Sequence, residues 1–246
     1  MLITSFKNKS KRYHRLIYIF MLLITAPVFA QNQVFWVSTT GNDTLDGSQA
    51  SPFATITYAL SVIGDQDTIR IEPGYYYEQL DISGLTGFND FVMQGASLTD
   101  TTAIVSLNPG PVMSIGMPLS NQTQIMNLLL THTNPDSLGP GIEIFSSNPI
   151  IENCTITGNN DNNPGGGIRI YSSGSVETPV IRDCRIHDNT ALGGGGIFAQ
   201  ASSVVIKHSI IEFNDALGYE GGGIFLQGCS GSTIAENQIH ANHGLQ

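Results

Sequence analysis

The clearest pattern in this chain is an alternation of apolar and polar residues that returns at intervals of roughly 25 to 30 residues from Thr123 onward. Within each unit, short segments carry an apolar residue flanked by polar ones, which is typical of strands and not of helices. Repetition with this period predicts a solenoid in which each unit forms one coil. Two sets of equivalent apolar positions follow: Ile125, Ile151, Ile181, Ile206 and Ile234, and then Leu130, Ile156, Ile186, Ile211 and Ile239.

Equivalent residues of neighbouring coils are expected to stack, because each strand would pair with the strands of the coils above and below it. The isoleucines then form inward-facing ladders, for which β-branched side chains are well suited. Four asparagines also recur at one position, where stacked amides can satisfy one another's donors and acceptors. These are Asn159, Asn189, Asn214 and Asn242.

Runs of glycine precede one strand in each of three units, at residues 165–167, 193–196 and 221–223. A phosphate-binding loop places its glycines between a strand and a helix, whereas strands are expected to follow the glycines here. Tight turns with positive φ are therefore the expected use of these glycines.

The N-terminal part is less regular and predicts a cap over about residues 34–82, followed by regular coils over about 120–246. A strand is expected at 34–37, and then a helix with Ser51 as N-cap and Pro52 in its first turn, ended by Gly64. Two strands are expected within residues 67–84, and one each in the segments FVMQG and AIVSL. The helix should cover the open apolar end of the solenoid with one stripe. That stripe consists of Ile56, Ala59, Leu60 and Ile63.

Residues 35–80, FWVSTTGNDTLDGSQASPFATITYALSVIGDQDTIRIEPGYYYEQL, resemble the N-terminal segment of secreted bacterial proteins of the pectate-lyase-like, right-handed parallel β-helix superfamily. The resemblance extends over residues 34–246 and implies an all-β, right-handed parallel β-helix with an N-terminal amphipathic capping helix. It does not imply one activity, because the superfamily contains lyases, hydrolases, epimerases and non-enzymatic surface proteins. The segments DNTALGGGGIFAQ and EFNDALGYEGGGIFLQ also resemble repeats of polymorphic outer-membrane proteins, which are surface adhesins.

The first thirty residues predict a secretory signal peptide, because a basic start is followed by an apolar run that ends in Val28-Phe29-Ala30. The run is short for a membrane span, and an uncleaved signal anchor is the alternative. Residues 31–246 would then form one β-helix domain, secreted or held at the cell surface, with no membrane span after cleavage. The chain stops after the asparagine of a repeat, so that further coils or a sorting domain are expected to follow.

Charge narrows the range of partners. Half of the ten Lys and Arg residues lie in the first thirty positions, which leaves five against 20 Asp and Glu in the remainder. So acidic a chain disfavours nucleic acid and anionic membranes as partners, and it disfavours polyanionic substrates unless a bound cation or a local basic patch offsets the negative charge. The expected partner is an extracellular polysaccharide or another molecule at the cell surface.

Neither the cysteines nor the acidic residues predict a metal or a cofactor. Cys154 and Cys184 occupy one position in successive repeats and are expected to be buried, with a disulfide bridge as the alternative. Cys229 stands apart from them. The acidic loop at 41–51 lacks the spacing of an EF-hand, so a solvated loop is expected, and calcium binding is the alternative.

The first candidate site is formed by the outward positions of the strands that follow the glycines. Exposed aromatic side chains in a row can stack on sugar rings, and insertion loops that cover these side chains are the alternative. The positions are Glu143, Arg169, Phe198 and Phe225, followed two residues later by Phe145, Tyr171, Gln200 and Gln227. Of these, the candidate ligand-binding residues are Arg169, Tyr171, Phe198 and Phe225.

A second candidate site lies on a later strand of each coil. An outward ladder places Glu212 between His187 and His240, and a carboxylate between two imidazoles can take part in general acid–base chemistry. A solvated ladder with incidental charge pairing is the alternative. The candidate catalytic residues are Arg185, His187, Glu212 and His240.

The resemblance to lyases implies an Arg or Lys base together with calcium held by acidic residues. No acidic cluster accompanies Arg185, and the paired-Asp and Gly-His-Gly motifs of polygalacturonase-like hydrolases are absent from the sequence. Arg182 and Lys207 align with Glu152, so that ion pairs between coils are expected there.

The sequence therefore favours a secreted or cell-surface β-helix protein that binds extracellular polysaccharide or mediates surface interaction. A polysaccharide lyase or glycoside hydrolase acting on the outward face is the alternative, and a purely structural surface stalk is a third possibility.

Overall fold

The computed structural model describes residues 32–84, 90–116, 119–134, 136–173, 177–218 and 221–244. Asn32–Gln246 form one compact unit, and the predicted signal peptide lies outside the described residues. Among the residues described, no helix has the length and apolar character needed to cross a membrane.

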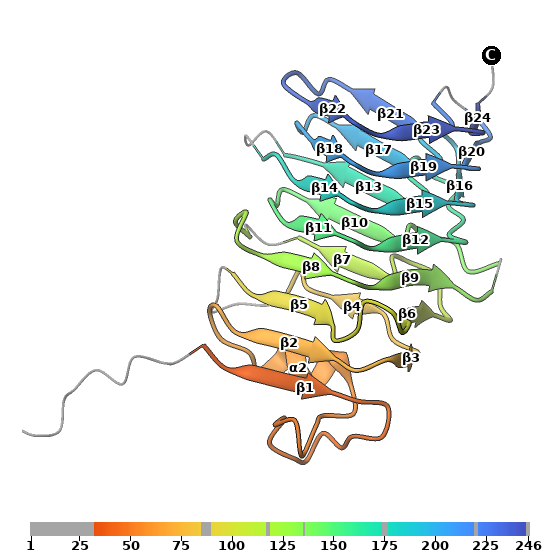
Figure 1. Cartoon of the computed structure of the whole chain (residues 1–246). Coiled ribbons are helices and arrows are strands. Elements are labelled where there is room, and N and C mark those ends of the chain that lie inside the picture. Colours follow the sequence, from red (N-terminus) through yellow and green to blue (C-terminus); the bar gives the residue numbers. More distant parts are fainter. Residues whose placement is uncertain are drawn as a thin grey trace, which may run out of the picture. The chain divides into compact units, whose positions relative to one another are not determined.

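The unit is a stack of coils in which the chain passes from one parallel sheet to the next, as Figure 1 shows. Sheet 1 has the order β21-β17-β13-β10-β7-β4. Its strands are Leu80–Asp81 (β4), Met113–Ile115 (β7), Ile142–Phe145 (β10), Ile168–Tyr171 (β13), Ile197–Gln200 (β17) and Ile224–Gln227 (β21).

Sheet 2 has the order β1-β2-β5-β8-β11-β14-β18-β22. Its strands are Val34–Val37 (β1), Thr68–Ile71 (β2), Val92–Gly95 (β5), Gln124–Met126 (β8), Ile150–Glu152 (β11), Val180–Arg182 (β14), Val205–Lys207 (β18) and Thr233–Ala235 (β22).

Sheets 3 and 4 complete the coils, with the orders β23-β19-β15-β12-β9-β6-β3 and β16-β20-β24. Sheet 3 contains Gly74–Tyr76 (β3), Thr102–Ser106 (β6), Leu129–His132 (β9), Thr155–Thr157 (β12), Arg185–His187 (β15), Ile210–Glu212 (β19) and Gln238–His240 (β23). Sheet 4 contains Thr190–Ala191 (β16), Asp215–Ala216 (β20) and His243–Gly244 (β24). The parallel β-helix predicted from the repeat is confirmed; sheet 4, and β3 as a third strand within residues 67–84, were not predicted.

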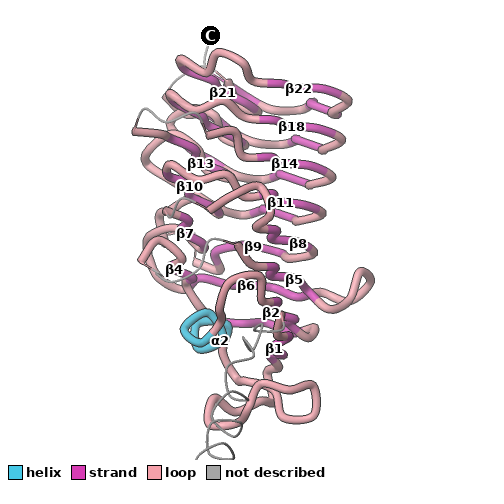
Figure 2. Tube along the Cα trace, turned by 90° about the vertical axis from the view of Figure 1, so that its left-hand side faces the viewer, coloured by secondary structure: helices cyan, strands magenta, loops and turns pink. Residues whose placement is uncertain are grey.

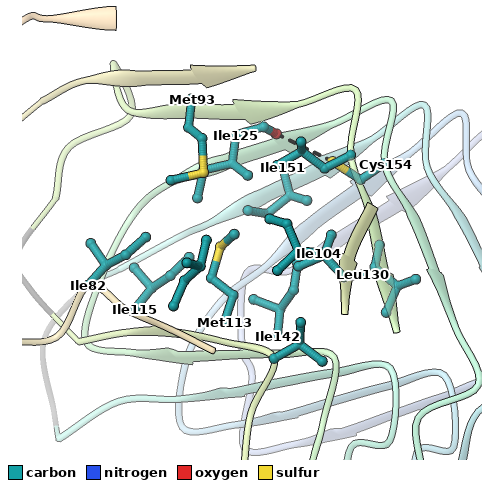
Figure 3. Packing of buried hydrophobic residues seen from close by; sticks show 14 of the residues in the cluster. Ile82, Met93, Ile104, Met113, Ile115, Ile125, Leu130, Ile142, Ile151 and Cys154 are labelled. Carbon is teal, nitrogen blue, oxygen red and sulfur yellow. Dashed lines mark hydrogen bonds between the residues drawn. The ribbon is translucent and has the colours of Figure 1, made fainter. Parts of the chain in front are cut away.

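The isoleucine ladders form the core, as predicted, except in the last described coil, where Ile234 and Ile239 are 45% and 47% exposed. Ile151 pairs in register with Ile125 on one side and Ile181 on the other, and all three are fully buried. Figure 3 shows side chains from the three larger sheets meeting in the interior, with Met93 and Ile125 from sheet 2 facing Met113 and Ile115 from sheet 1. Burial of apolar surface stabilises such a core by about 25 cal/mol per Å².

The asparagine ladder is also confirmed. The Nδ2 group of Asn159 donates to Oδ1 of Asn189 at 3.0 Å, Asn189 donates to Asn214 at 3.0 Å, and Asn214 donates to Asn242 at 2.9 Å. His132 takes the equivalent place one coil earlier, with its Nδ1 2.9 Å from Oδ1 of Asn159. The ladder therefore starts with an imidazole, which the sequence pattern did not indicate.

The glycine runs form turns, as predicted, but positive φ explains only one glycine in each run. Gly165, for example, has a φ of 86°. Gly167 is needed for a different reason, because a Cβ atom there would lie 2.5 Å from the carbonyl oxygen of Gly196 in the next coil. Gly167 must therefore be a glycine because neighbouring coils stack too closely there to leave room for a side chain.

The only helix among the described residues is α2, Ile56–Val62, and its N-cap is Thr55. The prediction of Ser51 as N-cap, with Pro52 in the first turn, was therefore wrong. Phe53 forms a parallel bridge with Val37, and this pairing keeps the chain extended up to Thr55. Two carboxylates then receive the free N–H groups of the helix start. Asp43 accepts from the backbone of Thr55 at 3.0 Å, and Glu78 accepts from that of Ile56 at 2.9 Å.

The helix packs against β1, β2 and β4 and buries Ile56, Ala59 and Leu60 of the predicted stripe. Figure 2 shows it beside β4, at the N-terminal end of the stack. In the preceding loop, Asp43 is engaged with the helix start, and Asp46 accepts from the backbone of Ser48 at 3.0 Å. These carboxylates therefore shape the chain locally.

Candidate functional site

The outer face of sheet 1 carries the first candidate site. Glu143, Arg169, Phe198 and Phe225 lie on neighbouring strands in direct register, and so do Phe145, Tyr171, Gln200 and Gln227. Strand alternation explains their direction, since the intervening residues, such as Ile168 and Ile170, are buried in the core.

Two adjoining hollows lie over this face. The larger has a volume of about 650 Å³ and is lined by Asn163, Pro164, Arg169, Tyr171, Phe198, Gln200, Phe225 and Gln227. The smaller, of about 340 Å³, is lined by Ser83, Ser114, Gly116, Glu143, Phe145 and Tyr171. Tyr171 belongs to both, and we call the two together the sheet 1 groove. All four candidate ligand-binding residues line its larger hollow.

Aromatic rings form two pairs in the groove. The ring centroids of Phe145 and Tyr171 are 5.0 Å apart, and those of Phe198 and Phe225 are 5.6 Å apart. Exposure varies widely among them, from 38% for Phe145 to 7% for Phe198. Phe145 is therefore accessible to a ligand, whereas Phe198, whose ring packs on that of Phe225, is largely covered.

Arg169 is fixed by three partners. Its Nε donates to the carbonyl oxygen of Pro164 at 2.8 Å, and its Nη1 donates to Oε1 of Glu143 at 3.0 Å. Its Nη2 forms an ion pair with Asp161, whose side chain is only 5% exposed. The positive charge of Arg169 is thus compensated by two carboxylates, one of them buried.

Asp161 is the site residue that the sequence analysis missed. It lies two residues after Asn159, in register with Ala191, which pairs with Ala216 in the next coil. The repeat has alanine at this position in those coils, so the alignment of coils gave no signal for a carboxylate. Besides pairing with Arg169, its Oδ1 accepts from the backbone and the amide of Asn163, at 2.9 and 3.0 Å. Asp161 therefore holds one wall of the groove against its floor.

Tyr171 and the two glutamines supply the neutral polar groups of the groove. Burial raises the pKa of Tyr171, and the negative charge of Glu143 together with a hydrogen bond to it raises this pKa further. The hydroxyl thus stays protonated near neutral pH. Gln200 donates from Nε2 to Oε1 of Gln227 at 2.8 Å, and a primary amide has further donors and acceptors to offer.

The second candidate set is also brought together, on the outer face of sheet 3. His187, Glu212 and His240 stack in register on β15, β19 and β23. Arg185 donates from Nε and Nη2 to Oε1 of Glu212 at 2.9 and 2.7 Å, and Nε2 of His240 lies 3.5 Å from Oε2 of Glu212. Asp188, which the sequence analysis did not consider, lies 2.5 Å from Nδ1 of His187.

This arrangement is a charge ladder across three coils. Both carboxylate oxygens of Glu212 have a basic neighbour: Oε1 accepts two hydrogen bonds from the guanidinium of Arg185, and Oε2 lies near the imidazole of His240. The charge of Arg185 is thus compensated by Glu212. Charge pairing between coils was the alternative to catalysis for these residues. The geometry described here supplies that pairing.

Of the two ion pairs predicted for Glu152, with Arg182 and with Lys207, only the first forms. Nη2 of Arg182 lies 2.6 Å from Oε2 of Glu152. Lys207 is in register with Arg182 instead, because β14 lies between β11 and β18. The expected pairing of Lys207 with Glu152 was therefore wrong: a coil separates them.

Two of the three cysteines lie in the interior, as expected for them, and Cys229 is half-buried. Cys154 and Cys184 are buried free thiols whose Sγ atoms lie 3.6 and 3.5 Å from the carbonyl oxygens of Ile125 and Ile151, respectively. Burial raises the pKa of the Cys184 thiol, and the neighbouring Cys154 adds to this effect.

Comparisons with known proteins agree with this fold. Residues 116–246 match the model of a family described as "Right handed beta helix region", and residues 39–82 match a family described as "Protein of unknown function (DUF1565)". No curated protein matches the chain.

Solved structures with a similar fold include pectin methylesterase PemA from Erwinia chrysanthemi, with a TM-score of 0.51 and 13% identity over 73% of this chain. The match spans 55% of PemA, so the chain corresponds to about half of that protein's length. A rhamnogalacturonan lyase has a TM-score of 0.40 and 13% identity over 87% of this chain and 70% of its own. At these identities the likeness concerns the fold alone. The match over more than half of the sequence and the parallel stacking of the coils lead to one assignment: the chain belongs to the right-handed β-helix family.

Proposed function

We propose that the sheet 1 groove binds the sugar rings of an extracellular polysaccharide. The observation that carries this proposal is the convergence of Tyr171, Phe198 and Phe225 in one hollow beside the amides of Gln200 and Gln227. A sugar ring has an apolar C–H face that packs on an aromatic ring, while its hydroxyl groups need hydrogen-bond partners at the rim. Binding sites in general combine an apolar lining with a few placed polar groups in this way.

The shape of the groove supports an extended ligand. Neighbouring parallel strands lie about 4.8 Å apart, so residues in register form rows that run across the strands along the solenoid. The two hollows follow such a row from Ser114 on β7 to Phe225 on β21 and meet at Tyr171. A polymer chain could lie along this row and contact several coils at once.

The location of the protein belongs to the same proposal. The predicted signal peptide would export residues 31–246, and the acidic remainder disfavours nucleic acid and anionic membranes as partners. We therefore place the binding site outside the cell or at its surface.

A glycan array followed by affinity electrophoresis tests the proposal with the full secreted chain. Phe225→Ala should weaken binding by about tenfold or more, which corresponds to about 1.4 kcal/mol. Tyr75→Ala is the matched control, because Tyr75 is an exposed aromatic residue on sheet 3, away from the groove. Equal effects of the two substitutions would contradict a binding site in the groove.

The same polysaccharides separate binding from catalysis. New reducing ends or unsaturated products that disappear in His187→Ala and Glu212→Ala would support an enzyme acting on sheet 3. Failure to bind any polysaccharide would favour a structural surface role.

A further inference from the structure

We propose that the sheet 1 groove selects uncharged glycans and rejects polyuronates, an inference that rests on the proposed function and names its ligand class. The strongest contacts to the carboxylates of an acidic polysaccharide come from a cation that can turn toward the ligand, either from a side chain or from a bound metal ion. The groove offers one cationic side chain, Arg169, among the described residues that line it.

Arg169 is already committed to the protein. Its Nη1 and Nη2 groups pair with Glu143 and Asp161, and its Nε donates to the backbone at Pro164. The side chains of Arg169 and Glu143 are 15% and 19% exposed, so water screens this cluster only in part. Turning Arg169 toward a ligand would leave the buried carboxylate of Asp161 without its counter-charge, which is strongly unfavourable.

The remaining charge balance is negative. Two carboxylates surround one guanidinium, and the other described residues that line the two hollows are neutral. Tyr171 keeps its proton because its pKa is raised. A uronate carboxylate that enters the groove would therefore meet a net negative charge in a partly desolvated place, where repulsion is stronger than in bulk water.

Uncharged sugars meet no such penalty. Their hydroxyl groups both donate and accept, and so they match the amides of Gln200 and Gln227 and the rim around Tyr171. Aromatic stacking on Phe225 is indifferent to the presence of a carboxylate elsewhere on the ring. Electrostatics in the groove thus selects the ligand class, and stacking supplies the attraction.

A matched pair of ligands tests this inference. A neutral hexose polymer that the protein binds is compared with the same polymer after oxidation of its C6 hydroxyl groups to carboxylates. Both are measured by affinity electrophoresis with the full chain in EDTA, which removes bridging cations. We expect the oxidised polymer to bind at least about tenfold more weakly at low salt, with a smaller difference at high salt because salt screens repulsion.

Two variants locate the effect. Glu143→Gln removes one negative charge from the groove and should reduce the discrimination against the oxidised polymer several-fold. Glu236→Gln makes the same change in overall charge at an exposed position on another face and should leave the discrimination unchanged. Urea denaturation of each variant shows whether the fold is retained.

The outcomes are distinguishable. Equal or tighter binding of the oxidised polymer, or identical behaviour of the two variants, would overturn the inference while leaving carbohydrate binding in place. Failure to bind any polymer, neutral or oxidised, would overturn the proposed function and the inference with it.

Discussion

Replacing Asn189 by alanine removes the central rung of the asparagine ladder. The side chain is fully buried and takes part in four hydrogen bonds. Its Oδ1 accepts from the backbone and the amide of Asn159, at 3.1 and 3.0 Å. Its Nδ2 donates to the carbonyl oxygen of Ile156 and to Oδ1 of Asn214, both at 3.0 Å. Alanine can provide none of these bonds.

The expected loss is large because water cannot replace the side chain in the interior. The backbone N–H of Asn159 would lose its acceptor, and a buried donor left unsatisfied costs about 1–3 kcal/mol. The other three bonds contribute about 0.5–1.5 kcal/mol each. We therefore expect the free energy of unfolding to fall by roughly 2.5–7.5 kcal/mol, a large part of the 5–15 kcal/mol that is typical of a domain.

Asn242→Ala is the matched control. Asn242 also makes four side-chain hydrogen bonds, to Asn214, Ile211 and His240, but it is half-buried in the last described coil. Water can reach the groups left behind, so we expect a loss of only about 1 kcal/mol.

Urea denaturation followed by far-ultraviolet circular dichroism measures both losses. Amide hydrogen exchange adds a test of whether the coil around position 189 opens on its own, since neighbouring coils of a solenoid are coupled only to one another. A loss below about 1 kcal/mol in Asn189→Ala, or equal losses at the two positions, would refute the reasoning that burial gives the ladder its strength.

Three further predictions follow from the same packing. Gly167→Ala should destabilise the fold by about 1–3 kcal/mol because its Cβ would clash with the next coil, whereas Gly84→Ala, with open space and no positive φ, should change the unfolding midpoint little. A thiol reagent should modify the half-buried Cys229 first and the buried Cys184 only on unfolding; rapid reaction of Cys184 in the native protein would contradict its burial. Burial raises the pKa of Tyr76 well above its usual value, so the stability that this group contributes is fully present below about pH 10, the unfolded pKa. It is lost at higher pH because only the unfolded state ionises, and urea denaturation at pH 9 and 11 should show the fall.

The regular coils could be predicted from the sequence because one physical requirement is repeated in every coil. Each equivalent of Ile151 must face inward and each equivalent of Asn189 must find an amide above and below, so period and alternation determine the register together. The same alternation identified the outward positions, which is why Tyr171 and Phe225 were found in advance.

Features that depend on a single long-range contact could not be read in this way. Thr55, and not Ser51, caps helix α2 because Phe53 is paired with Val37, whereas local capping preference alone pointed to Ser51. Asp161 takes the place that Ala191 and Ala216 take in the following coils, so only its position in the structure reveals its contact with Arg169. A repeat analysis identifies what neighbouring coils share, and a side chain that is particular to one coil, such as that of Asp161, escapes it.

Inward and outward positions alternate along each strand of sheet 1. The more exposed an outward side chain is, the less its removal should lower the stability of the fold, and the more directly a loss of binding can be assigned to the groove. Phe198 is a poor probe of binding, because at 7% exposure its removal also leaves a cavity against Phe225. Gln227 is exposed, and truncating it removes polar contacts at the rim without opening the core. Phe225 stands between these two cases, half-buried and in contact with the hollow. A loss of binding caused by Gln227→Ala at unchanged stability would therefore implicate the groove itself, whereas the same loss in Phe198→Ala could reflect damage to the coil beneath it.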